Sequence, residues 1–173
     1  MLVKQILNNN VVSAIDDRGF EVILTGRGLG FNTQNGAIVN EQAIEKIFHL
    51  QDSQVSARFK DLISEVPVEI VQLTADIVTL ARSQLSHKLS EGLYVTLADH
   101  LHFALQRNEK HEQLPNPLEW EVRHFYTAEY ALGRQAIGMV VARTGQLLPD
   151  SEACSIALHI VNAGLNDSMG KTT

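Results

Sequence analysis

The stretch "LVKQILNNNVVSAIDDRGFEVILTG", from Leu2 to Gly26, decides the fold of the N-terminal part of the chain. Three apolar runs rich in β-branched residues are separated by two turn signals, the asparagines 8–10 and "DRG" at 17–19. Asparagine and glycine favour turns, whereas valine and isoleucine favour strands. The pattern therefore predicts three short strands, with Phe20, Val22 and Leu24 on one face of the third.

The next segment, "RGLGFNTQNGA", is rich in glycine and asparagine and predicts a loop. The stretch "AIVNEQAIEKIFHLQ" that follows is ambiguous. Asn40 and Glu41 favour the start of a helix, whereas the residues from Lys46 to Leu50 also fit an edge strand.

Beyond residue 52 the apolar residues recur with the period of helices. Ser53 is a candidate N-cap for the first helix, and Pro67 breaks that helix and can open the next. Thr127 can divide a long helical segment, and Gly145 stops it. The sequence thus predicts two domains, a small all-β module of about 50–55 residues and an all-α bundle of about five helices.

Composition excludes several classes of protein. The chain has 173 residues, 45% of them hydrophobic, and no run approaches the ~18–20 apolar residues of a membrane span. Six basic and six acidic residues cancel through residue 60, so the net charge of −6 belongs to residues 61–173. This balance predicts no strong electrostatic footprint for nucleic acid, so any such binding must use a few well-placed groups. The single cysteine, Cys154, cannot form an internal disulfide, and we expect a cytoplasmic protein.

Two polar stretches in the β module are candidate binding elements. The three asparagines can form an extended hairpin turn, and asparagine side chains can also read base edges. The stretch "TGRGLGF", Thr25–Phe31, is neither a phosphate loop nor a dinucleotide fingerprint. It can be a loop that needs positive φ, but it also holds an arginine and an aromatic side chain, which suit phosphate contact and base stacking.

The histidines give little support for catalysis. His100 and His102 are two residues apart on a helix and point to different faces, which makes a poor metal pair. Asp99 lies beside His100, and His159 lies among apolar residues, where a satisfied core histidine is the usual finding. The sequence has no CxxC, no HExxH and no nucleophile motif, so we predict no metal, no cofactor and no enzyme.

Four motifs together, "NNNVV", "GRGLGF", "YVTLADHLHFAL" and "SEACSIALHIVNA", resemble bacterial transcriptional antiterminators of the BglG/SacY type. The resemblance covers essentially the whole chain. It implies a dimeric, four-stranded antiparallel RNA-binding domain at residues 1–55, with an edge strand in "AIEKIFHL". It also implies a linker helix at 56–65 and, at 66–173, the first phosphotransferase-system regulation domain, which also dimerises. Full-length members carry a second such domain, which we expect to be absent from this chain.

The resemblance also implies partners and site residues. The homodimer would bind a partly mismatched RNA hairpin, the ribonucleic antiterminator, in the leader of a sugar-utilisation operon and prevent terminator formation. Where the family often has a lysine, this chain has Gln5. Asn8 and Asn10 would project alike, which leaves Asn9 to the turn. By position, the RNA contacts would be Lys4, Asn8, Asn10, Gly26, Arg27 and Phe31.

Regulation in this family is by histidine phosphorylation. The modified positions match His100 and His159, and the donors would be the sugar transporter and the phosphocarrier protein of the phosphotransferase system. Asp99 is expected to orient the His100 ring.

Two alternatives remain. A DNA-binding or ligand-sensing dimeric regulator would need a helix-turn-helix, which the sequence does not indicate. A small enzyme using His100, Asp99 and His159 would need a nucleophile or a substrate clamp.

Overall fold

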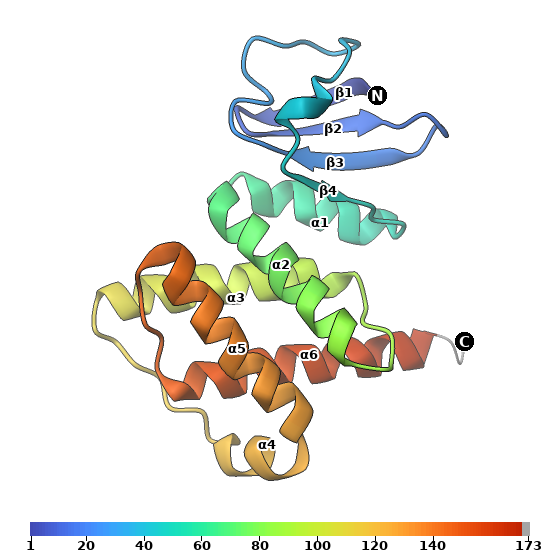
Figure 1. Ribbon diagram of the computed structural model, residues 1–173. Coiled ribbons are helices and arrows are strands. Elements are labelled where there is room, and N and C mark those ends of the chain that lie inside the picture. Colours follow the sequence, from blue (N-terminus) through green and yellow to red (C-terminus); the bar gives the residue numbers. More distant parts are fainter. Residues whose placement is uncertain (171–173) are drawn as a thin grey trace. The chain divides into compact units, whose positions relative to one another are not determined.

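The computed structural model describes the backbone of residues 1–170 and the side chains of residues 1–165. The chain forms two compact units, one made of residues 1–72 and one that begins at residue 73 (Figure 1).

The first unit contains an antiparallel sheet of four strands in sequence order, as predicted. The segment from residue 37 to residue 51, for which the sequence allowed a helix start or an edge strand, contains a helical turn followed by a strand. A short 3₁₀ turn, Glu41–Ala43, begins at Asn40, whose side-chain oxygen accepts a hydrogen bond from the backbone N–H of Gln42, and the edge strand follows. The strands are β1 (Leu2–Asn8), β2 (Val11–Ile15), β3 (Glu21–Thr25) and β4 (Lys46–Phe48).

One face of the sheet packs against the long loop between β3 and β4. Leu29 and Val39 of this loop are buried against alternate residues of the strands, which are Val3, Val12, Ala14, Val22 and Leu24. The prediction that Phe20 shares this face is wrong. The Asp16 carboxylate accepts hydrogen bonds from the N–H groups of Arg18 and Phe20, so Phe20 stays in the turn, and 62% of its surface is exposed.

The opposite face of the sheet packs against helix α1, Ser53–Ile63. The ring of Phe59 lies 4.7 Å from that of Phe48, centroid to centroid, and both are buried. Asp52, not Ser53, caps this helix: its carboxylate accepts hydrogen bonds from the backbone N–H groups of Gln54 and Val55. Both faces of the sheet are therefore covered within the first unit.

Six α-helices occur within residues 1–170, where the sequence predicted about five. The extra helix arises because the long segment divides, as the sequence allowed at Thr127: the φ of −125° and ψ of 56° at Tyr126 end α4, and α5 begins at Thr127. Gly145 ends α5 in a left-handed conformation, φ 77°, as predicted. Helix α2 begins in the first unit and continues into the second. The helices after α1 are α2 (Val68–Gln84), α3 (Gly92–Glu109), α4 (Glu119–Phe125), α5 (Thr127–Thr144) and α6 (Asp150–Gly170).

The core of the second unit lies between α3, α5 and α6. A Cβ atom on Gly133 of α5 would lie 2.2 Å from the carbonyl oxygen of Ala153 on α6, so only glycine permits these helices to approach so closely. Leu101 and Ile156 are fully buried in this core. Within the described residues, no helix is both long and apolar enough to cross a membrane.

Candidate nucleic-acid interface and histidine cluster

The asparagine turn joins β1 to β2, and the side chains of Asn8 and Asn10 bind different partners. The Asn8 side-chain oxygen accepts a hydrogen bond from the Asn10 N–H at 2.8 Å. The Asn8 side-chain amide donates to the carbonyl oxygen of Ile63 at the end of α1, at 3.5 Å. The Asn10 side-chain oxygen accepts from the N–H of Gly28 at 2.9 Å. Among the described residues the Asn10 amide nitrogen makes no hydrogen bond, so it is one donor of this turn that a ligand can use.

The glycine-rich loop lies directly against this turn. The N–H of Gly26 donates to the Asn10 carbonyl oxygen at 2.9 Å, and that of Gly30 donates to the Asn9 carbonyl oxygen at 2.8 Å. A Cβ atom on Gly30 would lie 2.0 Å from the Asn8 carbonyl oxygen, so any other residue would push the loop off the turn. Gly26 is buried, and a Cβ atom there would clash with the backbone of the loop itself, 2.0 Å from the carbonyl oxygen of Ala43.

Within the stretch Thr25–Phe31, Arg27 and Phe31 are the two side chains that are exposed to solvent. Phe31 is 62% exposed, although a large aromatic side chain is usually buried. Arg27 is also exposed, and within the described part of the chain its guanidinium makes no ion pair or hydrogen bond. Its backbone N–H donates to the Glu45 carboxylate at 3.0 Å, which fixes the position of the residue.

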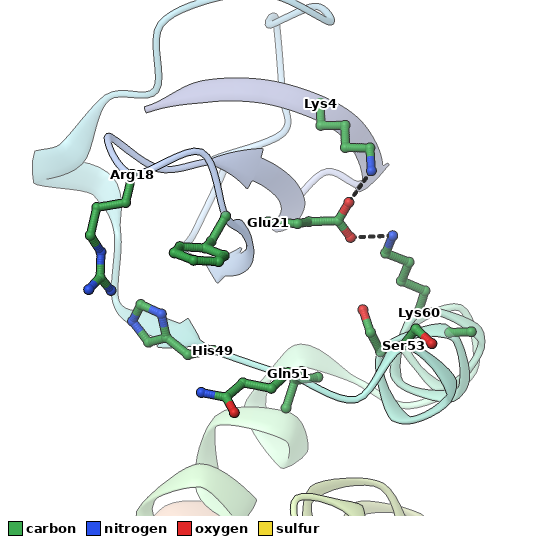
Figure 2. Close-up of a pocket in the computed structure, with 11 residues that line it drawn as sticks. Lys4, Arg18, Glu21, His49, Gln51, Ser53 and Lys60 are labelled. Atoms are coloured by element: carbon green, nitrogen blue, oxygen red, sulfur yellow. Dashed lines mark hydrogen bonds and ion pairs between the residues drawn. The ribbon is translucent and has the colours of Figure 1, made fainter.

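Lys4 takes no part in this arrangement. It forms an ion pair with Glu21, and Lys60 of α1 binds the other carboxylate oxygen of Glu21 (Figure 2). Burial alone would raise the pKa of Glu21, but the hydrogen bonds from the two lysines outweigh it and lower the pKa. These residues line a pocket with Phe20 and His49, whereas hydrogen bonds bring Asn8, Asn10, Gly26 and the backbone of the glycine-rich loop together.

The two predicted phosphorylation sites lie side by side in the second unit. The rings of His100 on α3 and His159 on α6 are 4.8 Å apart, centroid to centroid. Glu152 of α6 is only 5% exposed and binds the Nε2 atom of His100 at 2.7 Å. The other oxygen of Glu152 accepts a hydrogen bond from Arg107 of α3 at 3.1 Å.

Electrostatics sets the protonation of this cluster. Burial lowers the pKa of His159 to about 4, and the neighbouring His100 adds to the shift, so His159 is neutral at pH 7. Burial would raise the pKa of Glu152, but the hydrogen bond and charge of His100, followed by those of Arg107, lower it overall. The cluster therefore holds an ionised carboxylate beside a neutral imidazole, and the ring nitrogens of His159 make no hydrogen bond within the described part of the chain.

Sequence reasoning missed Glu152 and Arg107. The signal was present: Arg107 follows His100 by seven residues and Glu152 precedes His159 by seven, a spacing that returns to the same face of a helix. Asp99 is exposed and makes no hydrogen bond to His100 among the described residues, so its supporting role stays a prediction. In that same part of the chain, no group of three or more His, Cys, Asp or Glu side chains could hold a metal ion.

Comparison with known proteins agrees with the resemblance found in the sequence. Residues 1–57 match the CAT RNA binding domain, and residues 75–163 match the PRD domain. The chain is 43% identical over 169 residues to the transcription antiterminator LicT of Bacillus subtilis (strain 168), covering 98% of this chain and 61% of the relative. It is 42% identical to a beta-glucoside operon antiterminator of Dickeya chrysanthemi, covering 98% of this chain and 60% of that protein. The chain thus spans about three-fifths of the length of these curated relatives.

The fold agrees with the same assignment. The crystal structure of GlcT CAT-PRDI matches with a TM-score of 0.79 and 32% sequence identity, over 94% of this chain and 97% of that chain. Together the family matches account for both units, and the resemblance to antiterminators is confirmed. The chain belongs to the PRD domain family, and its PRD domain is preceded by a CAT RNA binding domain.

Proposed function

We propose that this protein is a transcriptional antiterminator. Its β module binds a partly mismatched RNA hairpin in the leader of an operon and so prevents the terminator from forming. The observation that carries this proposal is the hydrogen-bonded pairing of the asparagine turn with the glycine-rich loop, on which Arg27 and Phe31 are exposed and the Asn10 amide nitrogen has no partner among the described residues. The names of the relatives, transcription antiterminator and beta-glucoside operon antiterminator, support it.

Each exposed group has a role that suits RNA. Phe31 stacks on an unpaired base, a contact worth about 1–3 kcal/mol. Arg27 binds a phosphate or a guanine edge, and the Asn10 amide donates to a base edge in an internal loop, where bases are not hidden in a narrow groove. Asn8 holds the asparagine turn, and Gly26 and Gly30 bind the glycine-rich loop to it through their backbone N–H groups. Lys4 forms an ion pair with Glu21, so RNA would have to compete with the Glu21 carboxylate for a contact with Lys4.

The PRD domain makes this activity responsive to sugar transport. We propose that His100 and His159 accept a phosphoryl group from the sugar transporter or the phosphocarrier protein of the phosphotransferase system. Neutral His159 has the lone pair that such a transfer needs. A phosphoryl group with a charge near −2 would repel the buried Glu152 carboxylate, and this repulsion would change the packing of α3 against α6.

The proposal also includes the homodimer, the location in the cell and the domain limits that the sequence predicted. The protein acts as a homodimer, which doubles the number of RNA-binding groups that face one hairpin. It works in the cytoplasm, where nascent transcripts are made. The domain limits that we propose are 1–55 for the RNA-binding domain, 56–65 for the linker helix and 66–173 for the regulation domain, of which residues 171–173 lie outside the described part of the chain.

A gel-shift experiment tests the proposal. The chain should bind a mismatched RNA hairpin and should bind duplex DNA of the same sequence far more weakly. Asn10→Ala should lower the affinity for the hairpin by about 1–3 kcal/mol, because it removes the free amide and the oxygen that holds Gly28. Equal binding to DNA, or RNA binding that is unchanged by this substitution, would contradict the proposal.

A second experiment tests the regulatory half. After incubation with the phosphorylated phosphocarrier protein, intact-mass measurement should show a gain of one or more phosphoryl groups, and the His100→Ala, His159→Ala double variant should show none. A gain that survives in the double variant would show that other residues are modified.

A further inference from the structure

Glu45 holds the start of the glycine-rich loop at two points. Its backbone N–H donates to the carbonyl oxygen of Thr25 at 2.7 Å, where the loop leaves β3. Its carboxylate oxygen Oε1 accepts the N–H of Arg27 at 3.0 Å. Glu45 is the residue before β4, so this contact ties the beginning of the loop to its end.

Gln72 of α2 binds the second oxygen of the same carboxylate. The Gln72 side-chain amide donates to Oε2 of Glu45 at 2.9 Å and to the hydroxyl of Thr25 at 3.1 Å. Thr25 is fully buried, and Gln72 is half-buried. The Glu45 carboxylate is therefore held between the loop on one side and α2 on the other.

The sign of the charge makes this contact informative. A protein that binds the phosphate backbone gains affinity from cations and loses it from nearby anions. Yet an exposed carboxylate sits next to Arg27, and the hydrogen bonds from the Arg27 N–H and from Gln72 lower its pKa, so it remains ionised. The negative charge of Glu45 weakens the long-range attraction between the protein and RNA. If Glu45 favours RNA binding, it must therefore do so in another way than by electrostatic attraction.

We propose that Glu45 and Gln72 are positioning residues for RNA binding, which hold the backbone of Arg27 so that its guanidinium and Phe31 face the RNA together. This inference rests on the proposed function. Gln72 lies three residues before the PRD match begins at residue 75, on a helix that runs unbroken to Gln84. The contact thus links the RNA-binding loop to the helix that continues into the PRD domain.

Binding of a fluorescently labelled, mismatched RNA hairpin to the full chain tests this inference. Glu45→Ala should weaken binding by about tenfold, although it removes a negative charge. Glu45→Gln keeps an acceptor for the Arg27 N–H and should recover most of the loss. Gln72→Ala should weaken binding by about threefold. The double variant should bind about as well as Glu45→Ala alone, because both substitutions remove one connected network.

Two matched controls separate positioning from other effects. Glu65→Ala removes an exposed carboxylate, and Gln54→Ala removes an exposed amide, both in the same unit. Among the described residues, neither side chain forms a hydrogen bond or an ion pair with the loop. Neither should weaken binding by more than about twofold. The salt dependence supplies a second measurement: Glu45→Ala should lower the slope of log affinity against log salt by about 1, because the Arg27 contact with phosphate is lost.

The possible outcomes are distinct. Tighter or unchanged binding by Glu45→Ala, with normal binding by the unsubstituted chain, would overturn the positioning role alone and would mark Glu45 as a repulsive or neutral charge. A loss that Glu45→Gln does not reduce would also overturn it. An unsubstituted chain that does not bind the hairpin would overturn the proposed function and this inference with it.

Discussion

Two carboxylates, Glu45 and Glu152, make the same kind of contact in very different surroundings. Each binds one partner with each of its oxygens, and the pKa of each is lowered. Glu45 is exposed and binds neutral groups, a backbone N–H and a glutamine amide. Glu152 is 5% exposed and binds His100 and Arg107. The difference in burial therefore gives the two carboxylates different roles. Glu45 shapes a loop, whereas Glu152 contributes to the stability of the second unit and to its response to pH.

The largest expected effect is that of Glu152→Ala on stability. The substitution leaves the half-buried His100 and Arg107 without their common partner, and removal of one member of a buried charged network costs about 3 kcal/mol. Urea unfolding followed by the circular dichroism of the helices should show this loss. Glu112→Ala, which removes an exposed carboxylate from the same unit, should change the free energy of unfolding by less than about 0.5 kcal/mol. Equal effects of the two substitutions would contradict the role of burial.

Acid should destabilise the second unit next most strongly. The pKa of His159 falls from 6.5 to about 4 on folding, so between these values the unfolded chain binds a proton that the folded chain does not. Stability must then fall as the pH falls from 6.5 to about 4, by about 2–3 kcal/mol. The lowered pKa of Glu152 acts in the same direction, because its stabilising charge is lost as the pH falls through its folded pKa.

The substitution His159→Gln isolates this contribution. It removes the titrating group from the cluster, so the variant should lose much less stability than the unsubstituted chain between pH 6.5 and 4. Free energies of unfolding measured at several pH values give the comparison. Identical pH profiles for the two proteins would mean that His159 does not titrate as its burial requires.

The smallest expected effect is that of Glu45→Ala on stability. Because its carboxylate is exposed, water can replace both of its hydrogen bonds, and the free energy of unfolding should change by less than about 1 kcal/mol. The same substitution is expected to weaken RNA binding about tenfold. A loss of stability as large as that of Glu152→Ala would show that Glu45 supports the fold rather than the loop.

The sequence predicted some features of the β module and of the helical bundle better than others. The alternation of β2 and β3 and the turn at the asparagines predicted the sheet, because local propensity and burial agree there. The division of the long helical segment was also predicted, at Thr127, and the structure has the break next to it, at Tyr126. Spacing alone placed Asn8 and Asn10 on one face. It could not show that the Asn8 side-chain oxygen holds the asparagine turn itself, whereas that of Asn10 binds Gly28 of the glycine-rich loop.

Tertiary contacts surround the other site residues in ways that a local pattern could not show. Lys4 was grouped with the RNA contacts by its position near the asparagines, yet its partner Glu21 is seventeen residues away in the chain. Glu152 is 52 residues from His100, so a local sequence pattern cannot predict their contact. The seven-residue spacings indicate only that Arg107 shares a helix face with His100 and that Glu152 shares one with His159. The role of Asp99 beside His100 stays a prediction, because Asp99 is exposed and makes no hydrogen bond to His100 among the described residues.

The most direct test of RNA binding by the glycine-rich loop compares two phenylalanines. Phe20 and Phe31 belong to the same unit, and each is 62% exposed, but only Phe31 lies on the loop that packs against the asparagine turn. Phe31→Ala should weaken binding of the mismatched RNA hairpin by about 1–3 kcal/mol, roughly 5- to 150-fold, and Phe20→Ala by less than about twofold. Equal losses from the two substitutions, or no loss from Phe31→Ala, would contradict the account.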